Sequence, residues 1–285
     1  MIYDAVKTVL AKLDAQGAAD HDDWEDQISA RFASLSASYA ELTKCERDLI
    51  DYSDLATQAA YVFRYALPHA EFNYDFLRLA RQHIGAPLFS DTVMTVTSIG
   101  GGPGSELLGL LKYLSEASDE PKVKRIIYTV IDKERNWQHV LEEIISATKT
   151  KISIETLFQR CDVSSATINS KVTLDQEDVV FMSYFISEIC SLPQDLEVKA
   201  NLKTILQSLK KGKLLFYKDS SASTFYYYFN ARIQNAGKYE QLFDLKKKYN
   251  LNAPTYDGIF KKYIDEYGYD PKPSSDALSK VLKRI

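Results

Sequence analysis

Three glycines at alternate positions, Gly100, Gly102 and Gly104, form the most chemically informative segment of the chain. They lie with Gly101 between an apolar run and an amphipathic one, where a strand would turn into a helix. Glycine lets the backbone turn sharply and approach a ligand closely, and the first N–H groups of the helix are free donors. This context predicts cofactor binding, with a tight turn that holds no ligand as the alternative.

The glycine spacing separates two classes of nucleotide cofactor. A dinucleotide fingerprint requires G-x-G-x-x-G, and counting from Gly100 and Gly102 puts Ser105 where the third glycine belongs. The chain has G-x-G-x-G instead. An NAD-dependent oxidoreductase is therefore the weaker hypothesis, kept because loop and acid chemistry overlap between the two classes.

Asp132 comes directly after the apolar run at residues 126–131, which predicts a buried strand. A carboxylate at the carboxyl end of a strand can accept hydrogen bonds from both hydroxyls of a ribose. The alternative is that Asp132 caps the helix that follows. Trp137, at the start of that helix, either borders a nucleobase or packs in the core.

Two further expected strands are also followed by polar residues. Asp162 follows the third expected strand, and Ser183 and Tyr184 end the fourth, with Glu188 close behind. Ligands of open α/β sheets bind beyond the carboxyl ends of the strands, so we expect Ser183 and Tyr184 near a reacting centre. Tyr184 and Glu188 are the candidate catalytic residues, which would orient or deprotonate a substrate. The alternatives are an ordinary turn for Asp162 and a solvated helix position for Glu188.

The G-x-G-x-G loop, the acidic residue after the next strand and the segment 178–188 together resemble the class I (Rossmann-like) S-adenosylmethionine-dependent methyltransferase superfamily. The resemblance covers residues 93–217 and implies S-adenosyl-L-methionine as the cofactor. It implies that the glycines cradle the methionine part, that Asp132 binds the ribose and that Asp162 reaches the adenine amino group. The implied cofactor-binding residues are Gly100, Gly101, Gly102, Gly104, Asp132, Trp137, Asp162 and Ser183. The chain lacks the Asn-Pro-Pro-Tyr motif of many methylases of base or amide nitrogens, which puts that subclass in doubt.

In this superfamily, segments before the first strand often cover the cofactor and the acceptor. Tyr61 and Tyr65 are four residues apart, so they share one helical face, with Arg64 adjacent. We expect Tyr61, Arg64, Tyr65 and Tyr184 to contact the substrate, with packing against the sheet as the alternative for Tyr61 and Tyr65. His69 is expected on the surface or in a capped loop rather than as a base.

The elements that would position these residues follow from apolar periodicity. Residues 1–90 predict helices without strands, a helical N-terminal cap or substrate lid, and Pro68 is expected to separate two of those helices. Residues 91–285 alternate strand-like and helical runs, which predicts an α/β, doubly wound, Rossmann-like and mostly parallel sheet of about seven strands with helices on both faces. The expected late strands, 239–246 and 260–266, would add an antiparallel hairpin at one edge. The strands expected before them are 93–99, 125–131, 152–158, 178–184 and 213–217.

Composition bounds the class of protein. The chain has 285 residues, of which 45% are hydrophobic and 26% charged, so a packed core is expected. A formal net charge of −4 disfavours nucleic acid as a partner without excluding a local basic strip. No apolar run is long enough for a membrane span, and the three cysteines are widely spaced. We therefore expect a cytoplasmic protein without a membrane partner, a disulfide framework or a bound metal.

The sequence thus predicts an S-adenosylmethionine-dependent methyltransferase whose acceptor is a small or peptide-like molecule. The alternatives are a non-catalytic S-adenosylmethionine-binding regulatory or scaffold protein and an RNA or protein methyltransferase. An aromatic run at residues 225–229 would wall an acceptor pocket, dock a partner or pack in the core. The residues themselves do not indicate the acceptor or the oligomeric state.

Overall fold

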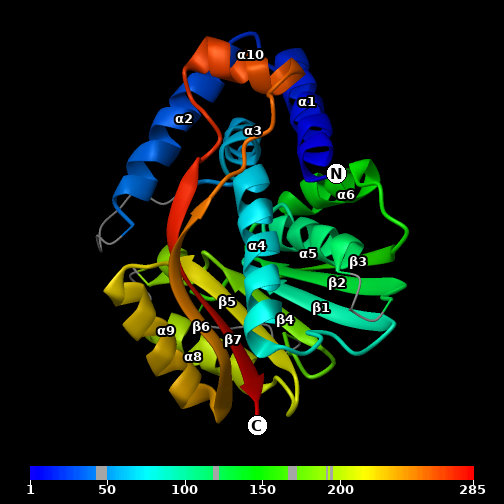
Figure 1. Ribbon diagram of the computed structural model, residues 1–285. Coiled ribbons are helices and arrows are strands. Elements are labelled where there is room, and N and C mark those ends of the chain that lie inside the picture. The colour runs from blue at the N-terminus through cyan, green and yellow to red at the C-terminus, as the bar shows by residue number, and fades with distance from the viewer. Residues whose placement is uncertain (43–49, 118–121, 166–171, 191, 193–194) are drawn as a thin grey trace.

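A computed structural model describes residues 1–42, 50–117, 122–165, 172–190, 192 and 195–285. Its centre is a sheet with the strand order β3-β2-β1-β4-β5-β7-β6 (Figure 1). The strands are β1 (Val93–Ile99), β2 (Arg125–Asp132), β3 (Ser153–Arg160), β4 (Val179–Ser183), β5 (Leu214–Ser220), β6 (Tyr239–Asn250) and β7 (Ser274–Arg284). Strands β1 to β5 pair in parallel, and β7 lies antiparallel between β5 and β6. This order confirms an α/β fold with a seven-stranded, mostly parallel sheet, whereas the antiparallel partner of β6 is β7 rather than the expected strand 260–266.

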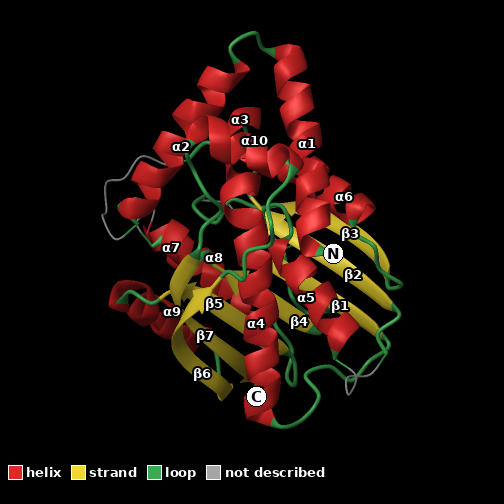
Figure 2. Cartoon of the chain, turned by 45° about the horizontal axis from the view of Figure 1, so that its top comes forward, coloured by secondary structure: helices red, strands yellow, loops and turns green. Residues whose placement is uncertain are grey.

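Helices cover both faces of this sheet (Figures 1 and 2). The helices between β1 and β6 are α5 (Ser105–Glu116), α6 (Trp137–Ala147), α7 (Ile186–Ile189), α8 (Asp195–Gln207) and α9 (Ser223–Ala236). Helices α4 and α5 pack together on one face, and α8 and α9 pack together on the other. Because the first five strands are parallel, their carboxyl ends meet at one edge of the sheet, where ligands of such folds bind.

The helical path before the sheet continues through Pro68, so the expected separation of two helices at this residue is wrong. Helix α3 (Leu55–Tyr61) leads into a π-helical turn, η1 (Val62–Ala66), and then into α4 (Leu67–Ile84). Pro68 is the second residue after this π-helical turn, and the wider turn accommodates a residue that has no N–H to donate. Wide turns of this kind occur mostly as single insertions in α-helices.

The segment after β6 also differs from its prediction, because the strand expected at 260–266 is helix α10 (Gly258–Tyr267). Phe260 and Tyr263 are three residues apart, as on one face of a helix, and both are fully buried. Their rings lie 5.3 Å from the ring of Phe63. The spacing of these buried positions is that of a helix and not of a strand.

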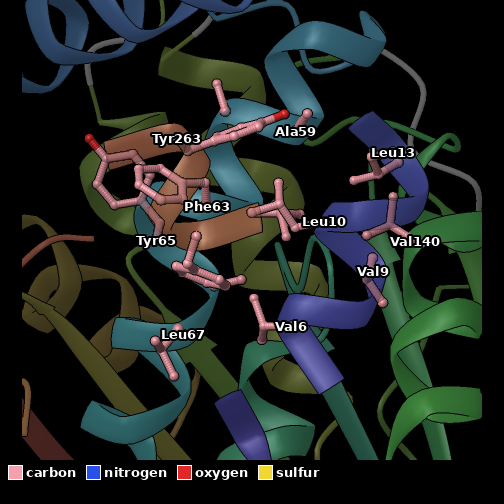
Figure 3. Close-up of a cluster of buried hydrophobic side chains, with 14 of the residues drawn as sticks. Val6, Val9, Leu10, Leu13, Ala59, Phe63, Tyr65, Leu67, Val140 and Tyr263 are labelled. Atoms are coloured by element: carbon pink, nitrogen blue, oxygen red, sulfur yellow. The ribbon is translucent and has the colours of Figure 1, made fainter. Parts of the chain in front are cut away.

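Helix α10 joins the N-terminal helices α1 (Ile2–Asp20) and α2 (Trp24–Ala40) in a common core. Figure 3 shows part of this core, with the labelled side chains Val6, Val9, Leu10, Leu13, Ala59, Phe63, Tyr65, Leu67, Val140 and Tyr263. Buried Asp14 links three helices, because it accepts hydrogen bonds from Trp24 Nε1 at 3.0 Å and from the Tyr263 hydroxyl at 2.9 Å. Within the described residues, no helix is both long and apolar enough to cross a bilayer.

Candidate functional site

A cavity of about 320 Å³ opens where the parallel strands end. Its wall includes Gly100 and Gly102 after β1, Asp132 at the end of β2, Asp162 after β3 and Ser183 at the end of β4. Cavities of a few hundred Å³ are typical of small-molecule sites. The fold thus brings polar residues from four neighbouring strands to one hollow at the carboxyl edge of the sheet.

The glycine loop forms one wall of the cavity. Gly100 and Gly102 line it with left-handed backbones, at φ +67° and +47°, a conformation that favours glycine. A Cβ atom at Gly100 would lie 2.3 Å from the ring of Phe185, so no side chain fits there. Gly101 and Gly104 shape the turn from outside the wall, where the Gly101 carbonyl accepts the N–H of Gly104 at 2.9 Å.

Asp132 connects the glycine loop to the turn before α6. Its Oδ2 accepts the N–H of Gly102 at 3.1 Å, and its Oδ1 accepts the N–H of Glu134 at 2.9 Å. A carboxylate has about four acceptor positions, so roughly two remain for a ligand in the cavity. Burial raises the pKa of Asp132 to about 6, and the two N–H donors oppose that rise. The carboxylate is therefore ionised at neutral pH.

Asp162 and Trp137 each lie on the cavity wall and also make contacts within the protein. Asp162 is exposed on the cavity wall, and its Oδ1 also accepts the N–H and hydroxyl of Ser164, at 2.9 and 2.7 Å. Trp137 lines the cavity with 2% of its surface exposed, and its ring packs 5.8 Å from Tyr52 and 5.4 Å from Tyr61. Both residues thus have a structural function besides their place on the wall.

The end of β4 brings Ser183, Tyr184 and Glu188 to the same cavity. Tyr184 has a φ of +55°, in the left-handed region that residues other than glycine rarely adopt. Its N–H donates to the Lys218 carbonyl at 2.7 Å, and its hydroxyl donates to Ser275 Oγ at 3.1 Å. Burial raises the pKa of Tyr184, so its hydroxyl stays protonated, which disfavours Tyr184 as a base.

The predicted substrate-binding residues of the N-terminal helices divide between the cavity and the core. Tyr61 lines the cavity, whereas Tyr65 is buried behind it, with the two rings 5.2 Å apart. Arg64 donates instead to the carbonyl oxygen of Asp270, between α10 and β7. The structure therefore brings Tyr61 and Tyr184 to the cavity but not Arg64 or Tyr65.

Several residues near the cavity have no signal in the local sequence pattern. Tyr39 in α2 and Tyr52 before α3 line the cavity and share a hydrogen bond of 3.0 Å between their hydroxyls.

The expectation for His69 is wrong, because it lies within α4 with 5% of its surface exposed and its ring stacks on Tyr184 at 4.2 Å. Its spacing of four residues from Tyr65 was the one available sign, since residues four apart share a helical face.

The aromatic run at 225–229 lies in α9, on the face of the sheet that α8 also covers. Phe225 and Phe229 are buried there, while Tyr227 is 68% exposed. None of these three residues lines the cavity. Core packing therefore accounts for the phenylalanines, and partner docking remains a prediction.

Comparison with known proteins agrees with this geometry. A protein-family model described as "Putative SAM-dependent methyltransferase" matches residues 10–236. No curated protein matches the chain in sequence. Among solved structures, the chain is similar to the mitomycin 7-O-methyltransferase MmcR, with 17% identity, 90% of this chain and 71% of that chain covered, and a TM-score of 0.45.

Two further solved structures show similarity at low identity. One is a TehB-like SAM-dependent methyltransferase from Corynebacterium glutamicum, with 10% identity, 90% of this chain and 99% of that chain covered, and a TM-score of 0.43. The other is the N-methyltransferase NodS from Bradyrhizobium japonicum in complex with S-adenosyl-L-homocysteine, with 13% identity, 75% and 86% covered, and a TM-score of 0.40. Because the family model spans most of the chain and includes the glycine loop, the chain belongs to this family of S-adenosylmethionine-dependent methyltransferases, and S-adenosylmethionine is its cofactor.

Proposed function

We propose that the protein transfers the methyl group of S-adenosylmethionine to a small-molecule or peptide-like acceptor, and that the cavity is its active site. The observation that carries this proposal is the contact between Asp132 and Gly102, which joins a carboxylate suited to ribose with a glycine loop on one wall. Ser183 and Tyr184 lie on the same cavity, so a cofactor bound there would face them.

The residues on the wall fit the cofactor part by part. Gly100 and Gly102 permit a close approach of the ligand to the backbone, since neither has a side chain in the way. Asp132 retains acceptor positions for the two ribose hydroxyls, and exposed Asp162 is suited to accept from an adenine amino group. We assign Trp137 to the border of the adenosine part and Ser183 to the methionine part.

When bound, S-adenosylmethionine supplies a sulfonium methyl that is already activated for displacement. Positioning and exclusion of water can then provide most of the acceleration. Tyr61 and Trp137 present aromatic surface to the cavity and would keep water out. Tyr184 would hold the acceptor through its neutral hydroxyl. Glu188, the wall carboxylate nearest to Tyr184 in sequence, would receive the proton that the acceptor releases.

We assign residues 1–90 to a cap over the site and residues 91–285 to the catalytic domain. Tyr39, Tyr52 and Tyr61 of the first segment lie on the cavity wall, which supports this assignment. Helix α10 extends the cap from the second segment, because it shares a core with α1 and α2. The cap therefore draws on both ends of the chain.

Release of S-adenosylhomocysteine in the presence of a panel of phenols, amines, carboxylic acids and short peptides tests turnover. We expect release with at least one class, and a large loss of kcat in Glu188→Gln with little change in cofactor affinity. Binding of the cofactor without release for every class would contradict the enzymatic proposal and favour a regulatory protein. Tyr184→Phe should raise KM for the acceptor more than it lowers kcat.

A further inference from the structure

Four buried side chains next to the cavity each have a polar atom without a hydrogen-bond partner among the described residues. They are His69 (Nε2), Asn73 (Nδ2), Glu106 (Oε2) and Lys218 (Nζ), and we call them the buried polar cluster. Their exposed fractions are 5%, 0%, 4% and 0%. Buried polar groups are almost always hydrogen-bonded in folded proteins, so several unpaired atoms in one place require an explanation.

Three members of the buried polar cluster, His69, Asn73 and Lys218, lie against the residues that end β4. Ser183 Oγ donates to Asn73 Oδ1 at 3.3 Å, and the ring of His69 stacks on that of Tyr184 at 4.2 Å. The Nζ of Lys218 lies 5.3 Å from the centre of the Tyr184 ring. Ser183 and Tyr184 line the cavity, whereas none of the four cluster residues does, so these two residues link the cluster to the cavity.

The cluster holds one basic and one acidic side chain, Lys218 and Glu106, and both are buried. Glu106 and Lys218 stabilise each other's charge, yet burial dominates for both residues: it raises the pKa of Glu106 to about 7 and lowers that of Lys218 well below its usual range. Neither forms an ion pair with another described residue. Unpaired buried charges are costly, so a ligand with complementary charges would stabilise this arrangement.

The strand order indicates which end of the cofactor meets the cluster. Across the sheet, Asp162 follows β3, Asp132 ends β2, the glycine loop follows β1, Ser183 ends β4 and Lys218 lies in β5. A cofactor with its adenine and ribose at β3 and β2 therefore extends across the glycine loop toward β4 and β5. Its far end is an amino acid, with one ammonium and one carboxylate group.

We propose that Glu106 and Lys218 bind the α-ammonium and α-carboxylate groups of the methionine end of S-adenosylmethionine, with Asn73 and His69 as neutral hydrogen-bond partners. This inference rests on the proposed function. The rings of Phe72, Tyr184 and Tyr249 enclose the Lys218 ammonium at 5.3 to 5.9 Å, so binding requires the flexible lysine stem to rotate toward the cavity.

Two ligands that differ only at this end provide the test. S-adenosylhomocysteine has the amino-acid end, whereas 5′-methylthioadenosine keeps the adenine, ribose and sulfur without it. We expect Lys218→Met and Glu106→Gln to weaken S-adenosylhomocysteine at least tenfold in calorimetric titrations and to change 5′-methylthioadenosine less than twofold. Lys213→Met, just before the opposite end of β5, is the matched control and should change neither affinity.

The outcomes separate this inference from the proposed function. Equal losses for both ligands, or no loss for either, would overturn the assignment of Glu106 and Lys218 while leaving the cavity as the cofactor site. Failure of the unmodified protein to bind either ligand would overturn the proposed function, and the inference with it.

A second measurement needs no variant and therefore does not depend on how the substitutions fold. At pH 7, titrations in buffers of different ionisation enthalpy should show a proton exchange with S-adenosylhomocysteine that 5′-methylthioadenosine lacks, because the charged amino-acid end would change the protonation of Glu106, whose pKa burial raises to about 7. Identical proton exchange with the two ligands would contradict the inference.

Discussion

Replacing Asp132 by alanine separates the cofactor role of this carboxylate from simple packing of the loop. Its two oxygens each accept one backbone N–H, at 2.9 and 3.1 Å, which leaves about two acceptor positions for ribose hydroxyls. Hydrogen bonds to a charged group contribute roughly 1.5 to 3 kcal/mol. We therefore expect Asp132→Ala to weaken S-adenosylhomocysteine by roughly 10- to 150-fold.

Calorimetric titration measures this loss, and thermal unfolding shows whether the variant is folded. The affinity for 5′-methylthioadenosine should fall by the same factor, because both ligands carry the ribose. Asp91→Ala, an exposed residue before the opposite end of β1, is the control and should bind as the unmodified protein does. A folded Asp132→Ala protein that keeps its affinity within twofold would refute the ribose assignment.

Three further predictions concern pH, the glycine loop and the core shared by α1, α2 and α10. Burial raises the pKa of Asp132 to about 6 in the folded protein, compared with roughly 3.9 in the unfolded chain. Ionisation of Asp132 therefore lowers the stability of the fold above about pH 6, and this cost disappears as the pH falls toward about 4. Ligand affinity should instead decrease below about pH 6, because a protonated carboxyl accepts fewer hydrogen bonds; a flat titration series from about pH 5 to 8 would contradict this. Gly102→Val should reduce the affinity for S-adenosylhomocysteine at least tenfold, because φ is +47° and the added side chain would project at the cavity wall. Unchanged binding in a folded variant would argue against a close approach of the ligand to the Gly102 backbone. Asp14→Ala removes the acceptor for the Trp24 and Tyr263 donors and should lower the free energy of unfolding by about 2 to 4 kcal/mol. The control Asp20→Ala, at an exposed residue, should lower it by less than about 0.5 kcal/mol. Equal melting temperatures for the two variants would contradict this prediction.

The sheet and the cofactor side of the cavity were predictable because their signals are local. A glycine loop after one strand and Asp132 after the next must meet, since β1 and β2 are neighbours in parallel register. The same logic placed Ser183 and Tyr184 on the cavity, because β4 pairs with β1 on its other side. Strand order and parallel direction thus carry most of the cofactor-site prediction.

The other side of the cavity depends on contacts that no local pattern reveals. Tyr39 and Tyr52 reach the wall because α2 and α3 fold over the sheet edge, and Lys272, from the segment after α10, lies 5.5 Å from the ring of Tyr184. Two local predictions were also wrong. The π-helical turn accommodates Pro68 within a continuous helix, and the strand expected at 260–266 is helix α10. Long-range packing, rather than propensity, decided these elements.

The most direct test of the central claim is a calorimetric titration of the purified protein with S-adenosylhomocysteine and, separately, with NAD. The geometry of the glycine loop and Asp132 predicts micromolar binding of S-adenosylhomocysteine and no comparable binding of NAD. Absence of S-adenosylhomocysteine binding, or tighter binding of NAD, would contradict the claim that this cavity is an S-adenosylmethionine site.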